Sequence, residues 1–143
     1  MFALIRAIFD FTKFYAVTHA TSVRNTVADT ILALINTGAA SPSNGLLVFH
    51  STGSPSDLAV LQFSVPAFGA AAAAIATANA ITACPSANGG TVATFDIRNS
   101  LNQQLIFGSV TATGGGGDIT LNSLAISQGQ QVSMTSLTYT AMP

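Results

Sequence analysis

Residues that could perform acid–base or metal chemistry are few in this chain. The 143 residues include five Asp, two His and one Cys, and no Glu. A metal site needs three or four clustered ligands, yet neither His19 nor His50 has another candidate ligand within four residues. No HExxH, GxSxG, phosphate-binding loop or CxxC motif occurs. The sequence therefore predicts no catalytic, metal-binding or cofactor-binding residue, and each histidine is interpreted as a solvated or core-edge side chain.

The other chemically active groups also have simple interpretations. Asp96 and Arg98 lie two residues apart in an alternating segment, which would place both side chains on one face of a strand. A solvated or interface ion pair of this kind contributes less than about 1 kcal/mol, so Asp96→Asn is expected to cost little. Cys84 has no basic neighbour in the sequence and is predicted to be an inert, small apolar residue.

The composition is poor in charge. Charged residues make up 6% of the chain, against about 25% in an average soluble domain. Such a chain cannot depend on charge repulsion for solubility, so its surface must consist of hydroxyl, amide and small apolar side chains. That surface suits a subunit covered by neighbours in an assembly better than a free enzyme. A net charge of −1 also leaves no basic patch for nucleic acid.

The first sixteen residues form an apolar segment with three charged residues inside it. These charges interrupt the segment too often for a membrane span or a signal peptide. Two interpretations stay open: an apolar helix or arm that docks on a neighbouring subunit, or a natural chain start at Val17. The predicted division is an extension over residues 1–21 and a single domain over residues 22–143. Candidate partner-contact residues in the extension are Phe2, Ile5, Ile8, Phe9 and Phe14.

An amphipathic helix is predicted over residues 22–37. Ser22 can accept a backbone N–H in the first turn, and Gly38 fits the left-handed position that ends a helix. Apolar side chains recur at helical spacing and form one stripe. Packing of this stripe on the domain's own sheet is favoured, and a subunit-contact surface is the alternative. The stripe consists of Val23, Val27, Ile31, Leu34 and Ile35, and the first three are also candidate partner-contact residues.

The remaining sequence is typical of β-structure. Residues 61–65 and 93–97 alternate apolar and polar side chains, and short apolar runs at 46–50 and 105–110 are bounded by turn residues. The Ala-rich segment at 69–80 is predicted to be a loop that leads into a strand. The pattern predicts a mainly β fold, namely an antiparallel β-sandwich of jelly-roll or immunoglobulin-like type with an N-terminal amphipathic helix.

Five stretches of the chain resemble one family. They are THATSVRNTVADTILALINTG (18–38), GLLVF (45–49), LQFSVPAFGAAAAAIATANAIT (61–82), GTVATFDIRNS (90–100) and GGDITLNSLAISQGQQVSMTSLTYT (116–140). In order and spacing they are similar to a family of small virion structural proteins of tailed bacteriophages. The chain departs from the family in NSLNQQ (99–104), where the family has a tighter hairpin, and in its first sixteen residues.

The resemblance implies a non-enzymatic component of the virion. The favoured role is a capsid decoration, or cement, protein that stabilises the head by binding the capsid lattice. The alternative is a tail, collar or fibre-associated binding module that contacts other virion proteins or host-surface glycans. The expected partners are the major capsid protein or other virion proteins, with no nucleic acid, membrane or cofactor. A homo-oligomer, with a trimer favoured, would cover the apolar surface of the subunit.

Overall fold

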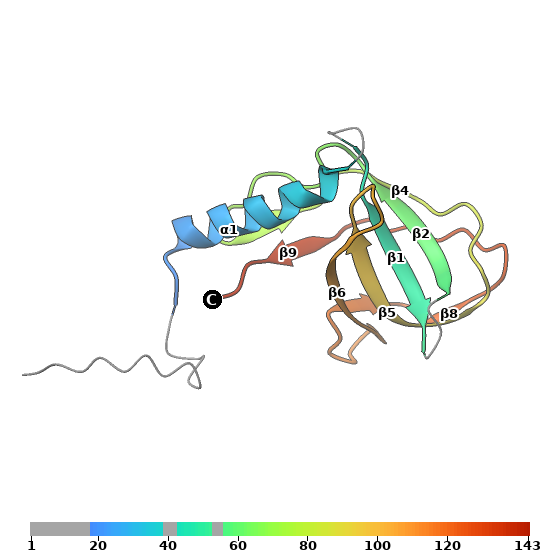
Figure 1. The fold of residues 1–143 in the computed structure, drawn as a ribbon. Coiled ribbons are helices and arrows are strands. Elements are labelled where there is room, and N and C mark those ends of the chain that lie inside the picture. The colour runs from blue at the N-terminus through green and yellow to red at the C-terminus, as the bar shows by residue number, and fades with distance from the viewer. Residues whose placement is uncertain (1–17, 39–42, 53–55) are drawn as a thin grey trace, which may run out of the picture.

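The computed structural model describes residues 18–38, 43–52 and 56–143, which form a curled seven-stranded sheet, a two-stranded sheet and one N-terminal helix (Figure 1). The prediction of a mainly β fold with an N-terminal helix is confirmed. Hydrogen bonds join the seven strands into one sheet, so the pairing does not divide them between the two facing sheets of a sandwich. The elements are α1 (Thr21–Ala33), η1 (Leu34–Asn36), β1 (Leu46–Ser51), β2 (Asp57–Phe63), β3 (Ile75–Thr77), β4 (Ile81–Thr82), β5 (Gly90–Arg98), β6 (Gln104–Ala112), β7 (Ile119–Leu121), β8 (Ala125–Ile126) and β9 (Thr138–Thr140).

The two ends of the helix differ from the prediction. The N-cap of α1 is Ala20, and no side chain caps the first turn, so the capping role predicted for Ser22 is wrong. The last turn tightens into the 3₁₀-helix η1, after which Thr37 is extended. Gly38 does not adopt the predicted left-handed conformation. A Cβ at this position would overlap the Ser100 side chain, so the glycine permits a close approach between the helix end and the turn after β5.

The main core lies on one face of the curled sheet. The order of its strands is β4-β2-β1-β5-β6-β7, and β8 pairs with β5. Because side chains alternate along a strand, Leu47 and Phe49 of β1 enter this core while Val48 lies on the opposite face. Cys84 is also buried in this core. The largest core side chains that are essentially fully buried are Ile35, Leu47, Phe49, Leu61, Phe63 and Val92.

The pair formed by β6 and β7 is parallel, which differs from the predicted all-antiparallel arrangement. Val110 pairs with Ile119, and the register continues to the ends of both strands. The short connection between the strands contains four consecutive glycines, of which Gly114 and Gly116 have φ values of +88° and +74°. Glycine adopts these angles at little cost. The chain can therefore turn back sharply enough to start β7 beside β6 in the same direction.

Asp118 fastens this connection to β6. Its Oδ2 accepts the Ser109 backbone N–H at 2.8 Å and the Ser109 hydroxyl at 2.7 Å. These two hydrogen bonds lower the pKa of the Asp118 carboxyl. A carboxylate whose folded pKa lies below its unfolded value contributes stability that is present above the unfolded value, and this contribution is lost as the pH falls through the folded value.

We therefore expect the difference in unfolding free energy between the wild type and Asp118→Asn to be full at neutral pH and to shrink below about pH 4. Urea denaturation of both proteins across this range measures the difference. Ser109→Ala serves as the control, because it removes the hydroxyl donor but keeps the backbone donor and the carboxylate. A difference that stays constant down to acid pH would contradict the prediction.

The helix and the small sheet form an arm that projects from the curled sheet (Figure 1). We use "the arm" for α1, β3 and β9, and "the ribbon" for the antiparallel pair β3–β9. Buried alanines form the centre of the arm: Ala28 of α1 packs with Ala74 and Ala141, and Tyr139 packs against them. Alanine side chains allow a close approach but bury little apolar area. The arm therefore has only a thin core of its own.

Candidate functional site

The side of α1 that faces away from the ribbon is apolar. Val23, Val27 and Leu34 are 46%, 42% and 45% exposed, and Ile31 is half-buried. Spacings of three and four residues place these side chains on one side of the helix. A row of partly exposed apolar side chains on one side of a helix makes this surface a candidate for contact with another molecule. We call this surface the α1 outer face; it consists of Val23, Thr26, Val27, Thr30, Ile31 and Leu34.

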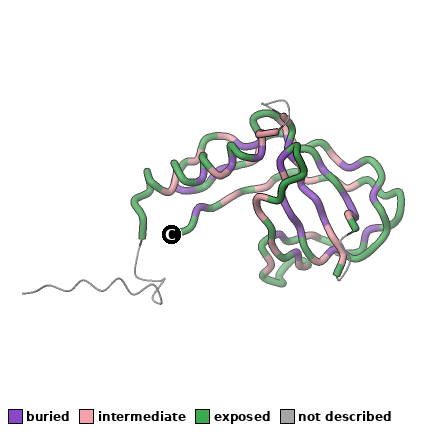
Figure 2. The backbone as a smooth tube through the Cα atoms, viewed as in Figure 1, coloured by how far each residue is buried: buried purple, intermediate pink, exposed green. Residues whose placement is uncertain are grey.

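The prediction that this apolar stripe packs on the domain's own sheet is wrong for most of the stripe. Only Ile35 among its five residues is fully buried. The helix instead buries Ala28 and Leu32, which lie farther round its circumference. Figure 2 shows these buried positions of α1 on the side toward the ribbon. The small Ala28 side chain lets the ribbon approach, so the larger apolar residues are left on the outside.

The threonines of the α1 outer face present no unpaired hydroxyl. Thr26 Oγ1 donates to the carbonyl of Ser22 at 3.0 Å, and Thr30 Oγ1 donates to the carbonyl of Thr26 at 2.7 Å. Both hydroxyls are therefore satisfied within the helix. A polar group that already has its partner can be covered by another surface at much lower cost than one that would lose a bond to water. The α1 outer face is consequently suited to burial along its whole length.

The charged and amide side chains of α1 lie off this face and hold the arm together. Arg24 donates from Nη2 to the carbonyl of Ala141 at 2.7 Å and from Nε to the carbonyl of Met142 at 2.9 Å. Asn25 Oδ1 accepts the backbone N–H of Ala74 at 2.7 Å. Asp29 Oδ1 accepts the backbone N–H of Ala71, also at 2.7 Å. Both charged side chains of the helix, Arg24 and Asp29, thus form hydrogen bonds with backbone groups of the same subunit.

Asn25 supports a strained turn at the start of the ribbon. Ala72 and Ile75 exchange two backbone hydrogen bonds, of 2.8 and 2.9 Å. Ala73 and Ala74 between them have φ values of 52° and 66°. Positive φ at both central residues is characteristic of a type I′ turn and is unfavourable for alanine. The hydrogen bond from the Ala74 N–H to Asn25 therefore ties the least favourable backbone of the arm to the helix.

The candidate partner-contact residues divide into two groups. The structure brings Val23, Val27 and Ile31 together on the α1 outer face, with the first two exposed and the third half-buried. The other candidates lie outside the described residues; they are Phe2, Ile5, Ile8, Phe9 and Phe14.

A cluster of polar side chains occupies the face of the sheet opposite the core. We call it the polar cluster: His50 on β1, Asp57 on β2, and Asp96 and Arg98 on β5. The backbone register pairs His50 with Asp57 across β1 and β2, and pairs Val48 with Asp96 across β1 and β5. Three neighbouring strands therefore bring together residues that lie far apart in the sequence.

Arg98 makes the most contacts in the polar cluster. Its Nε lies 2.8 Å from Asp96 Oδ1, and its Nη2 donates to Asp96 Oδ2 at 3.0 Å. The same Nη2 lies 3.2 Å from His50 Nε2 and 3.5 Å from Asp57 Oδ1. The hydrogen bond with Asp96 raises the pKa of the guanidinium further. Arg98 therefore keeps its charge throughout the pH range in which proteins fold.

The polar cluster holds strands together. Asp96 is 5% exposed, and its Oδ2 also accepts a hydrogen bond from Gln104 Nε2 on β6 at 3.1 Å. The prediction that Asp96 and Arg98 share one face is confirmed, but the interpretation of Asp96 as solvated is wrong. The involvement of His50 and Asp57 was not predicted. No local sequence signal indicates it, because it depends on the pairing of β1 with β2 and β5.

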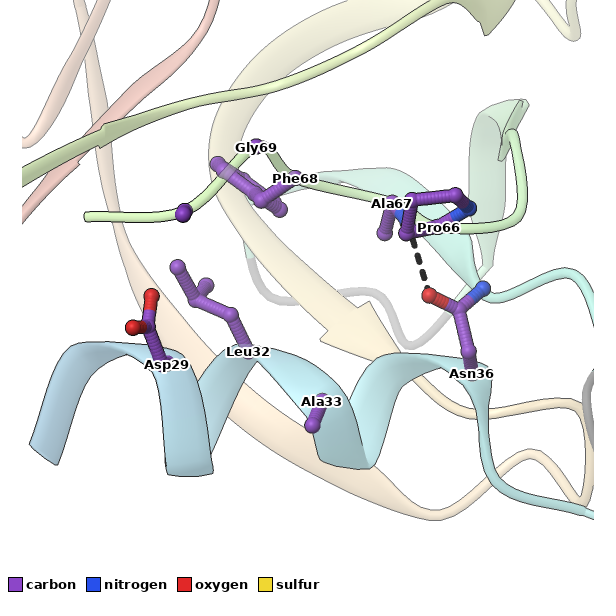
Figure 3. Close-up of a pocket in the computed structure, with 9 residues that line it drawn as sticks. Asp29, Leu32, Ala33, Asn36, Pro66, Ala67, Phe68 and Gly69 are labelled. Carbon is purple, nitrogen blue, oxygen red and sulfur yellow. Dashed lines mark hydrogen bonds between the residues drawn. The ribbon is translucent and has the colours of Figure 1, made fainter. Parts of the chain in front are cut away.

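A small hollow lies between α1 and the loop that follows β2. Its volume is about 180 Å³. Figure 3 shows Asp29, Leu32 and Asn36 directed from the helical segment toward this loop, with Asn36 Oδ1 accepting the Ala67 N–H at 2.7 Å. The Asn36 amide also donates to two backbone carbonyls. The polar groups around the hollow are therefore engaged in seating the helix on the sheet.

Every charged side chain in the described part of the chain binds a group of the same chain. In the polar cluster, Arg98 pairs with both Asp57 and Asp96. Arg24 and Asp29 hold the ribbon, and Asp118 accepts bonds from Ser109, as described above. Across residues 18–38, 43–52 and 56–143, no Asp or Arg side chain is thus left without a partner within the subunit.

No protein-family model, curated protein or solved structure matches this chain. No helix in the described segments is long and apolar enough to cross a membrane. Nor do the described residues include a group of three or more His, Cys, Asp or Glu side chains placed to hold a metal ion.

Proposed function

We propose that this protein is a non-enzymatic structural subunit of a tailed-bacteriophage particle, and specifically a decoration protein that binds the capsid lattice. The observation that carries the proposal is the α1 outer face, an uncharged apolar surface on an arm that projects from the β domain. Such a surface is costly in isolation and favourable once a neighbour covers it. A component of a large assembly always has such neighbours.

The distribution of charge supports the same role. The α1 outer face carries no charged residue, so it offers only apolar side chains and already bonded threonine hydroxyls to a partner; the exposed carboxylates of Asp29 and Asp118 lie elsewhere on the subunit. An interface formed by such groups does not require stripping water from unpaired charges, which is the costly part of burying polar surface. The sequence resemblance to small tailed-phage virion proteins points to the virion as the location. A jelly-roll or immunoglobulin-like sandwich is not required for this proposal; the mainly β domain and the arm suffice.

A second candidate function has one specific observation in its favour. Phe107 on β6 is 74% exposed, and it pairs with Asp96 of the polar cluster across the sheet. An exposed aromatic ring beside polar side chains is a suitable platform for a sugar ring. A tail, collar or fibre-associated module that contacts host-surface glycans would use this face of the sheet rather than the arm.

Quantitative gel analysis of purified virions, together with sedimentation of the pure protein with empty capsids, tests the proposal. We expect co-sedimentation that saturates in proportion to the capsid subunits, and virion copies in the same proportion. Absence of the protein from virions, or a copy number limited to a single ring, would overturn the decoration role. Phe107→Ala is the discriminating variant: it should leave capsid binding unchanged, whereas a glycan-binding module would lose its ligand.

A further inference from the structure

We infer that copies of this chain bind one another through the α1 outer face, packing their helices around a cyclic symmetry axis. This inference rests on the proposed function, because it names the first partner of the same surface. Four residues along the centre of this face are separated by intervals of four, three and four positions: Val23, Val27, Thr30 and Leu34. Alternating intervals of three and four are the spacing that lets helices pack along a continuous seam.

We call the row formed by Val23, Val27, Thr30 and Leu34 the seam. The side chains in the seam favour a second copy of this chain over a charged partner. No charged residue lies on the α1 outer face, and Arg24 and Asp29 are both engaged on the other side of the helix. When identical surfaces meet, any charge in the seam would face a like charge or be buried without a partner. The α1 outer face avoids both costs. A partner with a charged surface would have to bury its charges without compensation.

Water can also be excluded from the seam without breaking hydrogen bonds. Thr30 lies within the heptad pattern, and its hydroxyl donates to the carbonyl of Thr26, so its methyl group is the part available for packing. Thr26 beside it is satisfied in the same way. Val23, Val27 and Leu34 supply the larger apolar groups. Both hydroxyls would keep their hydrogen bonds if another helix covered this surface.

The size of the surface sets the expected strength of association. The 13 residues of α1 span about 20 Å at 1.5 Å per residue, which is short for a coiled coil. Stable dimers usually bury about 800 Å² per partner, more than one side of such a helix provides. We therefore expect reversible association that depends on concentration, with each helix contacting a neighbour on both sides in a closed ring. Such contacts would be strengthened where a lattice holds the copies close together.

Sedimentation equilibrium of the full chain over a wide concentration range tests this inference. The wild type is expected to approach a whole multiple of the monomer mass. Leu34→Lys and Val27→Lys should each weaken association at least tenfold, because each would place like charges together in the seam. The matched control is Leu101→Lys, since Leu101 is 53% exposed in the turn after β5, close to the 45% of Leu34. Circular dichroism melts establish that each variant is folded.

Two results would overturn the inference: a wild type that stays monomeric up to its solubility limit, or an association that Leu34→Lys and Val27→Lys weaken no more than Leu101→Lys does. Capsid co-sedimentation of the same proteins separates this outcome from failure of the proposed function. If the protein is monomeric but still binds capsids, association between copies is refuted and the decoration role is retained. If the protein forms an oligomer but does not bind capsids, the decoration role is refuted and association through the α1 outer face is retained.

Discussion

Replacing Phe63 with alanine is expected to lower the free energy of unfolding by about 3–5 kcal/mol. The side chain is fully buried at the end of β2, and its ring centroid lies 5.7 Å from that of Phe68 in the loop beneath α1. Removing the ring loses its buried apolar area and leaves a cavity where the sheet meets the segment that seats the helix. Few other single changes in this chain should cost as much.

Urea denaturation followed by circular dichroism measures this loss. Phe107→Ala is the matched control, because it removes the same atoms from a side chain that is 74% exposed. Its unfolding free energy should stay within about 0.5 kcal/mol of the wild type. Equal losses in the two variants would mean that Phe63 does not lie in a close-packed core, which would contradict the fold described here.

Replacing Asp96 with alanine is expected to cost about 3 kcal/mol, because it removes one partner of a buried ion pair. Arg98, whose side chain is 15% exposed, would keep only the longer contact with Asp57 as a charge partner. Gln104 would also lose an acceptor. This expectation replaces the small cost that the sequence alone predicts for Asp96→Asn, since that prediction assumed a solvated or interface ion pair.

Two comparisons make the Asp96 prediction specific. Asp29→Ala removes a carboxylate that accepts a single backbone N–H, and it should cost about 1 kcal/mol. Replacing both Asp96 and Arg98 with leucine should recover much of the loss, because the two most buried charges are then removed together. Asp57 loses its contact with Arg98, but its side chain is 41% exposed and stays accessible to water. If Asp96→Ala costs no more than Asp29→Ala, the polar cluster does not stabilise the sheet in the way proposed.

Residue periodicity was sufficient to predict which segments form the helix and the strands, but not which side of the helix is buried. In segments 61–65 and 93–97, the alternating residues Leu61, Phe63, Phe95 and Ile97 lie in the core. The alternation failed at Val65, which lies beyond the end of β2 and is 41% exposed. The same method located the helix but chose the wrong side as buried. A hydropathy pattern gives alanine little weight, and it contains no information on the hydrogen bonds that Arg24 and Asp29 form with backbone atoms next to the ribbon.

The polar cluster could not be predicted from spacing, because its members come from three strands. Bringing His50 next to Asp57 requires the register between β1 and β2, which shifts between Phe49 and His50. A second irregularity lies between His50 and Ser51 in the pairing of β1 with β5. A shift of one residue moves a side chain to the other face of a sheet. Such shifts depend on long-range packing, which leaves no signature in local sequence.

The attachment of the ribbon to α1 has a consequence for sequence divergence. Arg24, Asn25 and Asp29 all bind main-chain carbonyl or N–H groups in the segments that flank the ribbon, before β3 and after β9. Every residue carries the carbonyl, and every residue except proline also carries the N–H. Substitutions at exposed ribbon positions therefore leave these bonds intact, whereas substitutions at the three helix positions break them. Descendants of this chain are expected to drift freely along the outside of the ribbon while retaining the same arm.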